Sequence, residues 1–460
     1  MAGTSRCLVF WAVSRSLLRC RSHRECGHAG GHTGLPPAET ARPVTRERPP
    51  VGSSTRNDCF LVVEDRSSQR CMAGSPPIIY LNNAATTWPK PPEVLEAVRQ
   101  SLALPVFGSG RTTGSQGEDY VTLAREALAS LLAADPPEHV VFTQNATDSL
   151  NLLIQGFLAG CEAGCRVITT ALDHNSVLRP LHELERQRRI RLTVLPFEDG
   201  AVSPESVEAA VTPDTRLMVT AHGSNVLGSV QDISCIGEVL HDHGVFFIVD
   251  GAQTAGHIPV DLRALPVDAY VFTGHKGLFG IPGTGGFYLR DPESVAPVRY
   301  GGTGTDSFSL FQPPGMPERF EAGTHNHPGL AALAAGANYI ASIGVAAIAE
   351  KAERQTAFLI RELKKEPNVT VYNEHPSLPI ISFNIQGMEN DDVGFILARA
   401  YGVVARTGLH CAPLVHRAID DGIGSVRLSL SWFTTDEECR TAARAVQEIA
   451  RNANSSIGSS

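Results

Sequence analysis

The sequence predicts an α/β protein, with a large domain built on a mostly parallel seven-stranded sheet and a smaller α+β domain after it. Between residues 139 and 289, short apolar runs alternate with helix-length segments, which is typical of strand–helix–strand units with right-handed crossovers. After Gly329 the pattern changes to two long helical segments, followed by short strands and helices. We therefore expect the large domain at residues 76–329 and the small domain at residues 330–460.

Length and composition exclude several classes of protein. The chain has 460 residues, 42% of them hydrophobic, which is enough for a large core. No uninterrupted apolar run of about 18 residues occurs, which argues against membrane-spanning helices, and the net charge of −9 argues against nucleic-acid binding. The ten cysteines lack the dense spacing of a secreted disulfide framework, so we expect reduced thiols. We predict no nucleic-acid partner, no membrane partner and no metal site.

Residues 1–75 differ from the rest of the chain. They contain 11 Arg, no Lys and 6 acidic residues, which leaves a charge of −14 on the remainder. They show no sustained helical or strand period, so we predict a disordered leader. Its Arg- and Ser-rich composition is typical of a mitochondrial transit peptide, and a disordered or mistranslated extension is the alternative. We expect a cytoplasmic protein, or a mitochondrial one if the leader is a transit peptide.

The large domain is predicted from its apolar runs, after a first short strand at residues 78–81. The seven strands of the sheet are expected at residues 139–143, 166–170, 191–195, 216–221, 245–250, 269–273 and 286–289. Helical patterns occupy residues 120–134, 148–159, 177–189 and 235–243.

The small domain is predicted from the mixed pattern after Gly329. We expect helices at residues 330–343, 345–365, 391–400 and 435–451. Strands are expected at residues 369–372, 380–385, 403–406 and 425–431.

Ligands of an open α/β sheet bind beyond the carboxyl ends of its strands, so residues that follow the apolar runs are candidates. Lys276 follows one strand and precedes a glycine-rich run. It suits a Schiff base because desolvation lowers the pKa of an amine; a surface loop lysine is the alternative. Asp250 follows another strand and is either a helix cap, a solvated loop residue or the partner of a protonated ring nitrogen, as pyridoxal phosphate requires. Gln253 could donate to the phenolic oxygen of that ring.

A phosphate site is predicted where the first strand of the sheet turns into a helix. Ala146 and Thr147 lie at this turn, where free N–H groups and the helix dipole favour an anion. The alternative is a plain N-cap. Thr273 and His275 could complete the phosphate site. His174 follows another strand and is either an ordinary loop histidine or a residue that stacks on the ring and moves protons.

Cys411 is the cysteine with a plausible activating context. It lies in a glycine-containing loop after a strand, with Arg406 and His410 near it in sequence, and a nearby cation or base promotes ionisation of a thiol. Arg427 lies within an apolar strand, where it either captures a substrate carboxylate or forms a structural ion pair.

Taken together, residues 78–450 resemble class V aminotransferase-fold enzymes, specifically the cysteine desulfurases and selenocysteine lyases. The motifs that carry the resemblance are Tyr80-Leu-Asn-Asn-Ala-Ala-Thr-Thr87, Asp250-Gly-Ala-Gln253, Gly274-His-Lys276, Arg319-Phe-Glu-Ala-Gly-Thr324 and Arg406-Thr-Gly-Leu-His-Cys411-Ala. The last resembles the short loop of the group II enzymes. The resemblance implies the fold type I of pyridoxal-phosphate-dependent transferases.

The resemblance also implies roles for particular residues. Lys276 would bind pyridoxal phosphate covalently, with Asp250 and Gln253 on the ring, His174 stacked over it, and Asn225 near both ring and substrate. The phosphate site would comprise Ala146, Thr147, Thr273 and His275, and Thr324 would reach the phosphate of a neighbouring subunit, which implies a homodimer. Arg427 would bind the substrate carboxylate, and Cys411 would be the nucleophile that becomes a persulfide.

The loop Gly108–Gln116 departs from the family, because it lacks a His-Arg-Gly-x-His pattern found in group II members. The predicted function is a pyridoxal-phosphate-dependent cysteine desulfurase that converts L-cysteine to L-alanine and passes sulfur to an unidentified acceptor protein. The alternatives are a selenocysteine lyase acting on L-selenocysteine, another lyase or aminotransferase acting on a small amino acid, and a carrier protein that binds the cofactor without turnover.

Overall fold

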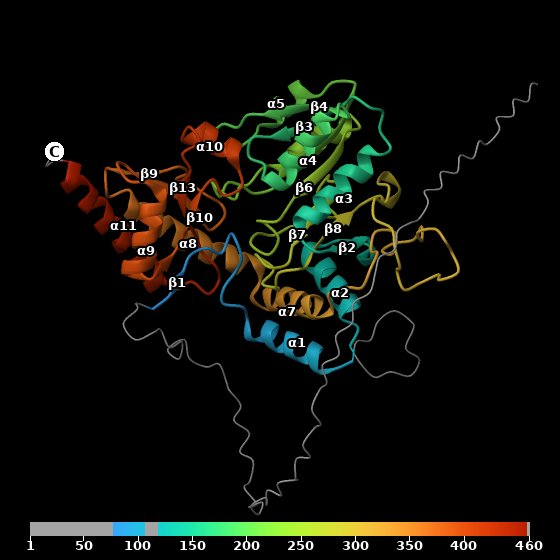
Figure 1. Ribbon diagram of the computed structural model, residues 1–460, viewed down its shortest axis with the longest axis horizontal. Helices are drawn as coiled ribbons and strands as arrows, with labels where there is room; N and C mark the ends of the chain where they lie inside the picture. The colour runs from blue at the N-terminus through green and yellow to red at the C-terminus, as the bar shows by residue number, and fades with distance from the viewer. Residues whose placement is uncertain (1–76, 106–117, 458–460) are drawn as a thin grey trace, which may run out of the picture. The chain divides into compact units, whose positions relative to one another are not determined.

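A seven-stranded sheet forms the centre of the computed structural model, which describes residues 77–105 and 118–457 (Figure 1). In order across the sheet, the strands are β2 (Val140–Thr143), β8 (Gly285–Leu289), β7 (Ala269–Thr273), β6 (Phe246–Asp250), β5 (Thr215–Ala221), β3 (Cys165–Thr170) and β4 (Ile190–Leu195). Strand β8 runs antiparallel to both its neighbours, and all other neighbours pair in parallel. The predicted mostly parallel sheet is confirmed, with every strand boundary within one residue.

Helices cover both faces of this sheet, so its strands are buried on both sides. One apolar core contains residues of α3 (Ala146–Leu158) and α4 (Asn175–Arg186). The other contains residues of α2 (Tyr120–Leu132), α6 (Ile233–Asp242) and α7 (His327–Ile343). Along β6, Phe246 and Ile248 enter the first core whereas Phe247 and Val249 enter the second, as the alternation of strand side chains requires.

The C-terminal part of the chain builds a second sheet with its own core. Four antiparallel strands follow the order β12 (Arg406–Gly408), β13 (Ser425–Ser429), β10 (Ile380–Ile385) and β9 (Val369–Val371). Helices α8 (Val345–Leu363), α9 (Asn390–Tyr401) and α11 (Asp436–Ile457) lie beside it (Figure 1). Five elements were not predicted, namely α1 (Pro92–Ala103), α5 (Pro204–Ala210), α10 (Pro413–Ile419) and two 3-10 turns at Pro137–His139 and Pro292–Ser294.

The predicted strand at residues 403–406 is wrong in one respect, because the chain changes sheets within it. Strand β11 (Val403–Val404) pairs in parallel with β1 (Ile79–Tyr80), whereas β12 begins at Arg406 and pairs with β13. The first strand of the described chain therefore joins the C-terminal part rather than the central sheet. Ile79 and Leu81 accordingly lie in the C-terminal core.

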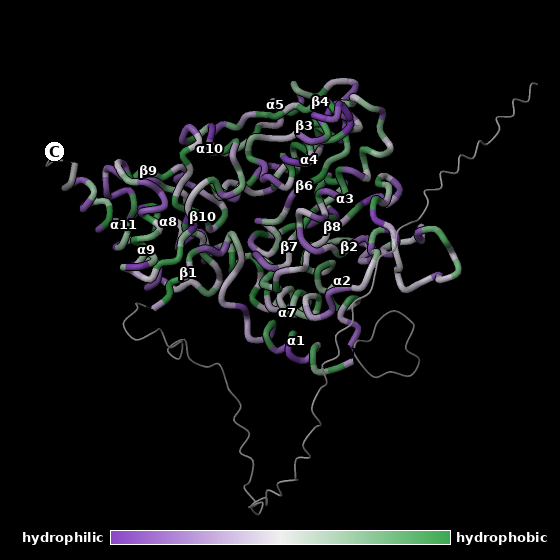
Figure 2. Tube along the Cα trace, viewed as in Figure 1, coloured by the Kyte–Doolittle hydropathy of each residue, from purple (hydrophilic) through white to green (hydrophobic). Residues whose placement is uncertain are grey.

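The described residues all belong to one compact unit. The predicted leader at residues 1–75 lies outside the described residues, and the boundary between residues 329 and 330 stays a prediction. Among the described helices, none alone is long and apolar enough to cross a membrane; α7 and α8 meet that criterion only as a pair that is bent by 77°. Figure 2 shows the distribution of hydrophobic and hydrophilic residues along these elements.

Candidate active site

A cavity of about 550 Å³ lies at the carboxyl ends of the parallel strands, where residues of the C-terminal sheet close over it. Every predicted site residue except Thr324 lines this cavity: Ala146, Thr147, His174, Asn225, Asp250, Gln253, Thr273, His275, Lys276, Cys411 and Arg427. Residues that are up to 281 positions apart in the sequence, such as Ala146 and Arg427, therefore share one site. The roles assigned to them stay predictions.

The backbone of Lys276 is held by glycine contacts and by hydrogen bonds from the first described segment. A Cβ on Gly277 would lie 2.4 Å from the carbonyl oxygen of Ala255, so only glycine fits there. The Thr87 hydroxyl donates to the carbonyl oxygen of Lys276 at 3.0 Å, and the Lys90 ammonium donates to that of His275 at 3.0 Å. Lys276 is thus presented from a fixed turn after β7.

The electrostatics of Lys276 fit a reactive amine. Burial lowers its pKa to about 8, the Asp250 carboxylate partly opposes this shift, and Arg427 adds to it. Burial raises the pKa of Asp250. Two neighbours oppose this shift: the backbone N–H of Ala252, which donates to Asp250 Oδ1 at 3.0 Å, and the charge of Lys276. A buried amine and a buried carboxylate therefore face the same cavity, as the sequence predicts.

Several buried polar atoms at the cavity have no hydrogen-bond partner among the described residues. They are Gln253 Oε1, Thr273 Oγ1, His275 Nδ1 and Arg427 Nε. Buried polar groups are normally paired, so unpaired atoms gathered at one cavity indicate a polar ligand. At the same cavity, Ala146 and Thr147 begin α3, whose first N–H groups lack partners within the helix.

His174 caps α4, and its ring is neutral. Its Nδ1 accepts from the backbone N–H of Ser176 at 3.0 Å, so the proton of the neutral ring lies on Nε2. Burial, followed by the charges of Lys276, Arg427 and Arg179, lowers its pKa to about 4. Burial next to cations therefore disfavours the imidazolium form of His174.

The preceding residue, Asp173, fixes the ends of two strands. Its carboxylate accepts from Thr170 N and the Thr169 hydroxyl, each at 2.7 Å, and from Ala221 N at 2.6 Å. Burial raises the pKa of Asp173 to about 6, against the effect of these hydrogen bonds. The contact joins the ends of β3 and β5 and so determines where His174 stands.

Arg427 is buried, being 3% exposed, and forms no ion pair among the described residues, so the alternative of a structural ion pair is not observed. One of its Nη atoms donates to the carbonyl oxygen of Asn225 at 2.7 Å. Burial, then the charge of Arg406, lowers its pKa to about 10, so the side chain stays cationic at neutral pH. A buried guanidinium that has no counter-charge among the described residues suits a carboxylate ligand in this cavity.

Cys411 reaches the cavity from the C-terminal part of the chain, with an exposed side chain. Two hydrogen bonds tie its loop to segments that follow strands of the large sheet: Asn175 N–H at the start of α4 donates to the Cys411 carbonyl at 2.8 Å, and the Asn225 amide after β5 donates to the His410 carbonyl at 2.7 Å. The described cysteines other than Cys411 (Cys161, Cys165, Cys235 and Cys439) do not line the cavity, and each has a raised pKa.

His410 does not provide the cation that its position next to Cys411 suggested. Its Nε2 contacts the carbonyl oxygen of Ser425 at 3.1 Å, and burial lowers its pKa to about 2. Sequence reasoning also missed Arg406 as a site residue in its own right. Arg406 stands opposite Arg427 in the β12–β13 ladder and lines the cavity. The pairing of two strand arginines is visible only once the strand register is known.

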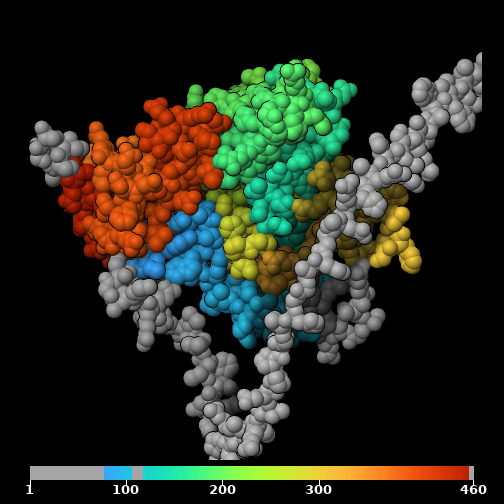
Figure 3. Space-filling view, viewed as in Figure 1, coloured from blue at the N-terminus to red at the C-terminus, as the bar shows by residue number. Residues whose placement is uncertain are grey.

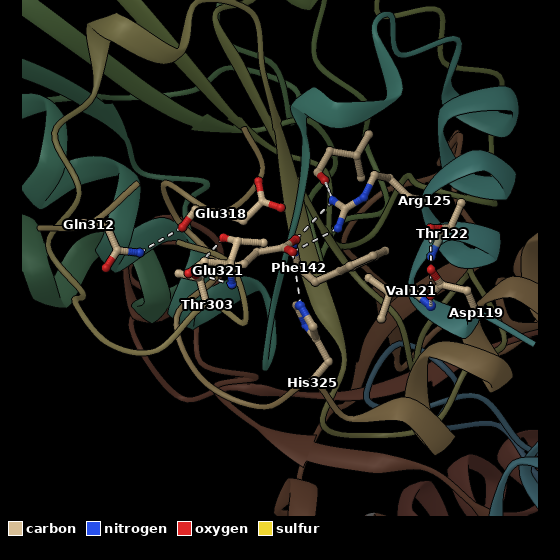
Figure 4. Close-up of polar contacts among 12 residues, drawn as sticks. Asp119, Val121, Thr122, Arg125, Phe142, Thr303, Gln312, Glu318, Glu321 and His325 are labelled. Carbon is tan, nitrogen blue, oxygen red and sulfur yellow. Dashed lines mark hydrogen bonds and ion pairs between the residues drawn. The ribbon is translucent and has the colours of Figure 1, made fainter. Parts of the chain in front are cut away.

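Thr324 is exposed and lies outside the cavity. Figure 4 shows how the segment before it is anchored: Glu321 accepts from Arg125 on α2 at 2.9 Å, from Phe142 N at 2.7 Å and from His325 at 3.2 Å. Burial opposes ionisation of Glu321, but the contacts with His325 and Arg125 outweigh it and lower the pKa. The predicted loop Gly108–Gln116 lies outside the described residues.

Comparison with known proteins defines the family. The model of the family "Aminotransferase class-V" matches residues 79–441, so the chain belongs to this family. The chain is 33% identical over 386 residues to a probable cysteine desulfurase of Methanothermobacter thermautotrophicus, a match that covers 81% of this chain and 94% of that protein. It is 32% identical over 387 residues to a cysteine desulfurase of Escherichia coli, covering 82% and 94% of the two chains.

Solved structures agree with this result. An apo cysteine desulfurase from Thermococcus onnurineus has a TM-score of 0.76 and 30% identity, with 82% of this chain and 95% of that chain covered. The cysteine desulfurase CsdA from Escherichia coli has a TM-score of 0.74 and 26% identity, with 81% and 94% covered. The predicted family and fold class are confirmed.

Proposed function

We propose that this chain is a pyridoxal-phosphate-dependent cysteine desulfurase that converts L-cysteine to L-alanine and forms a persulfide on Cys411. The observation that carries the proposal is that Lys276 and Cys411 line one cavity, together with the unpaired Arg427. Its relatives over more than four fifths of the chain are named cysteine desulfurases, which supports the same activity.

The unpaired buried atoms of the cavity fit pyridoxal phosphate. Asp250 would pair with the ring nitrogen, Gln253 would contact the phenolic oxygen, and His174 would lie against the ring face. The N-terminus of α3, with Ala146 and Thr147, would hold the phosphate together with Thr273 and His275. Pyridoxal phosphate, when bound, supplies an aldehyde for a primary amine and a ring that withdraws electrons from the substrate carbon.

The residues of this chain then bind the substrate and move its proton. Arg427 binds the α-carboxylate of cysteine, and Asn225, which is tied to the Cys411 loop, borders the same space. Lys276 Nζ, whose pKa of about 8 leaves part of it neutral at pH 7, takes the Cα proton. His174 is neutral and cannot supply a positive charge at this step.

The sulfur is transferred to Cys411. Its thiolate attacks the substrate sulfur, so that an S–S bond forms while the Cβ–S bond of cysteine breaks, and the electron pair of that bond stays on the substrate. Protonation at Cβ and return of a proton from Lys276 Nζ to Cα then complete L-alanine. Cys411 is left as a persulfide, which an acceptor protein or an added thiol then removes.

The test measures alanine and sulfide formed from L-cysteine with and without a reducing thiol. We expect Cys411→Ser to lose at least a hundredfold in sulfide release, because a hydroxyl does not replace a thiolate as the nucleophile. Cys235→Ser, an exposed cysteine outside the cavity, is the matched control and should behave as wild type. Full sulfide release by Cys411→Ser would refute the proposal. Turnover of L-selenocysteine in the same assay discriminates a selenocysteine lyase.

We also propose that the active form is a homodimer. A loop with exposed apolar side chains supports this: Phe308 is 100%, Leu310 97% and Phe311 86% exposed. This loop stands out from the surface in gold (Figure 3). Light scattering should give a dimer mass for wild type and a lower mass for Phe308→Ser/Phe311→Ser. A monomeric wild type contradicts the proposal.

The location of the protein is proposed as cytoplasmic, with a mitochondrial location as the alternative. The dispersed cysteines, which lack a disulfide framework, support the cytoplasmic location, whereas the 11 Arg and 6 acidic residues of residues 1–75 support the mitochondrial alternative. Fractionation of cells that express the full chain and a chain beginning at residue 76 distinguishes the two. Loss of mitochondrial protein in the shorter chain alone would establish a transit peptide.

A further inference from the structure

The loop that carries Cys411 has a backbone conformation that non-glycine residues rarely adopt. His410 has a φ of 50° and Cys411 a φ of 60°. This left-handed region is strained for a residue with a side chain, and such strain persists only where surrounding contacts impose it. The hydrogen bonds from Asn175 N–H and from the Asn225 amide to the carbonyls of Cys411 and His410 supply part of this restraint.

The His410 ring is bound on the side of β13. Its Nε2 lies 3.1 Å from the carbonyl oxygen of Ser425, and because a carbonyl only accepts, Nε2 carries the hydrogen. Nδ1 of the neutral ring is then an acceptor. It is buried and has no partner among the described residues. His410 therefore lacks one hydrogen-bond donor.

On the other side of Cys411, His416 on α10 pairs with Asp420, the residue that follows the helix. His416 Nδ1 lies 2.7 Å from Asp420 Oδ2, and the two side chains are 0% and 2% exposed. Asp420 Oδ1 also accepts from the backbone N–H of Gly422 at 3.1 Å. His416 provides the only ion pair that Asp420 makes among the described residues. A buried carboxylate is stabilised by hydrogen-bond donors or by a positive partner, and His416 is the side chain in contact with Asp420 that can become positive.

The second nitrogen of His416 points to the same conclusion. His416 Nε2 is buried without a partner among the described residues, and the His416 and His410 rings have centroids 5.5 Å apart. A neutral His416 would leave two bare acceptors, His416 Nε2 and His410 Nδ1, beside a buried carboxylate. A doubly protonated His416 neutralises Asp420 and makes Nε2 a donor, which the acceptor Nδ1 on the neighbouring His410 ring lacks.

We propose that His416 is a buried imidazolium that links Asp420 to His410 and thereby positions Cys411. The chain of contacts runs from Asp420 through His416 and His410 to Ser425, and it joins α10 to β13 on the two sides of the nucleophile. His416 is a positioning residue, since it does not line the cavity. The role of the positioned thiol rests on the proposed function, whereas the charge of His416 does not.

The charged and titratable groups around this pair come from three other elements. Arg427 on β13 and Arg406 on β12 oppose a positive charge near His410, and Tyr372, just beyond β9, lies within range of Asp420. The contact of Asp420 with His416, at 2.7 Å in a site closed to water, is the closest of these interactions. It favours the imidazolium because opposite charges attract most strongly at short range and low dielectric.

The charge of His416 is tested by nitrogen NMR. The full chain, loaded with pyridoxal phosphate, is labelled with ¹⁵N at the histidine rings, and the signals of His416 are identified by their loss in His416→Gln. At pH 7.5 we expect both ring nitrogens of His416 to be protonated and His410 to be protonated at Nε2 alone. A bare ring nitrogen on His416 at this pH overturns the proposal.

The positioning role is tested with Asp420→Asn, and Asp421→Asn, an exposed acid at the next position, is the matched control. Asp420→Asn should lose the second proton of His416 and lower kcat for alanine formation roughly 10- to 100-fold, with KM and the absorbance of bound cofactor unchanged. An unchanged kcat in folded Asp420→Asn overturns the positioning role. If Asp420→Asn does not fold, the wild-type spectrum still decides the charge. Absence of alanine formation by wild type would instead refute the proposed function.

Discussion

The reactivity of Lys276 can be predicted from its burial. An ordinary lysine has a pKa of 10.5, whereas burial lowers that of Lys276 to about 8. At pH 7 about one Lys276 amine in ten is then neutral, against about one in 3,000 for an ordinary lysine, a gain of roughly 300-fold in the form that attacks an aldehyde. We therefore expect the rate of covalent capture of pyridoxal phosphate by the apoprotein to rise with pH and to level off above about pH 8.

The assay follows the absorbance change on mixing apoprotein with pyridoxal phosphate from pH 6 to pH 10. Asp250→Asn is the informative perturbation, because the Asp250 carboxylate raises the pKa of Lys276. Its removal should move the midpoint of the profile below pH 8, whatever happens to the amplitude. Asp268→Asn is the control. Asp268 lies at the opposite end of β7 from Lys276, and its carboxylate accepts from Phe247 N, so its replacement should leave the midpoint of the pH profile unchanged.

Two results would refute this reasoning. A wild-type midpoint near pH 10.5 would mean that burial does not depress the pKa of the amine. A midpoint that rises in Asp250→Asn would mean that the carboxylate does not act on Lys276 with the sign that the structure indicates.

Three further predictions concern binding and stability. Arg427→Gln should raise KM for cysteine about 10- to 100-fold with a smaller change in kcat, since a charge-assisted hydrogen bond is worth about 1.5–3 kcal/mol; an unchanged KM in steady-state assays contradicts the carboxylate site. Lys276→Met should raise the free energy of unfolding of the apoprotein at pH 7 by at most about 3 kcal/mol in urea titrations, because a protonated amine is costly to bury. This gain should vanish as the pH rises from about 8 to 10.5, since the wild-type amine is then neutral in the folded and, finally, in the unfolded chain. Glu321→Gln leaves the Arg125 guanidinium buried without a counter-charge, so we expect the free energy of unfolding to fall by about 3–5 kcal/mol. A melting temperature equal to that of wild type would show that this ion pair does not stabilise the fold.

The central sheet was predictable because each of its strands is encoded locally. Each strand is a short apolar run bounded by polar or glycine residues, and burial on both faces keeps that run continuous. The single strand predicted at residues 403–406 was wrong because the pairing of these residues is not encoded locally. Val403–Val404 and Arg406–Gly408 belong to two different sheets, and nothing within five residues records which partner strand each one meets.

The candidate site was predicted in its members but not in their electrostatics. Lys276 and Asp250 follow buried strands, a placement that already indicates ligand chemistry. The low pKa of His174 and the binding of His410 to Ser425 depend on burial and on neighbours far away in the sequence. His410 is next to Cys411 in the sequence, but its ring contacts Ser425 instead of the thiol of Cys411.

The sequence by itself determined the family, the order of strands and helices, and the residue types gathered at the strand ends, because these follow from local patterns of apolar, glycine and polar residues. Only the tertiary structure decided which side chains share a cavity, that Arg406 stands opposite Arg427, and that His416 lies buried against Asp420. The physical reason is that burial and charge neighbourhood are properties of the packed chain: the same side chain is a solvated base in a loop and a neutral or paired group in the interior.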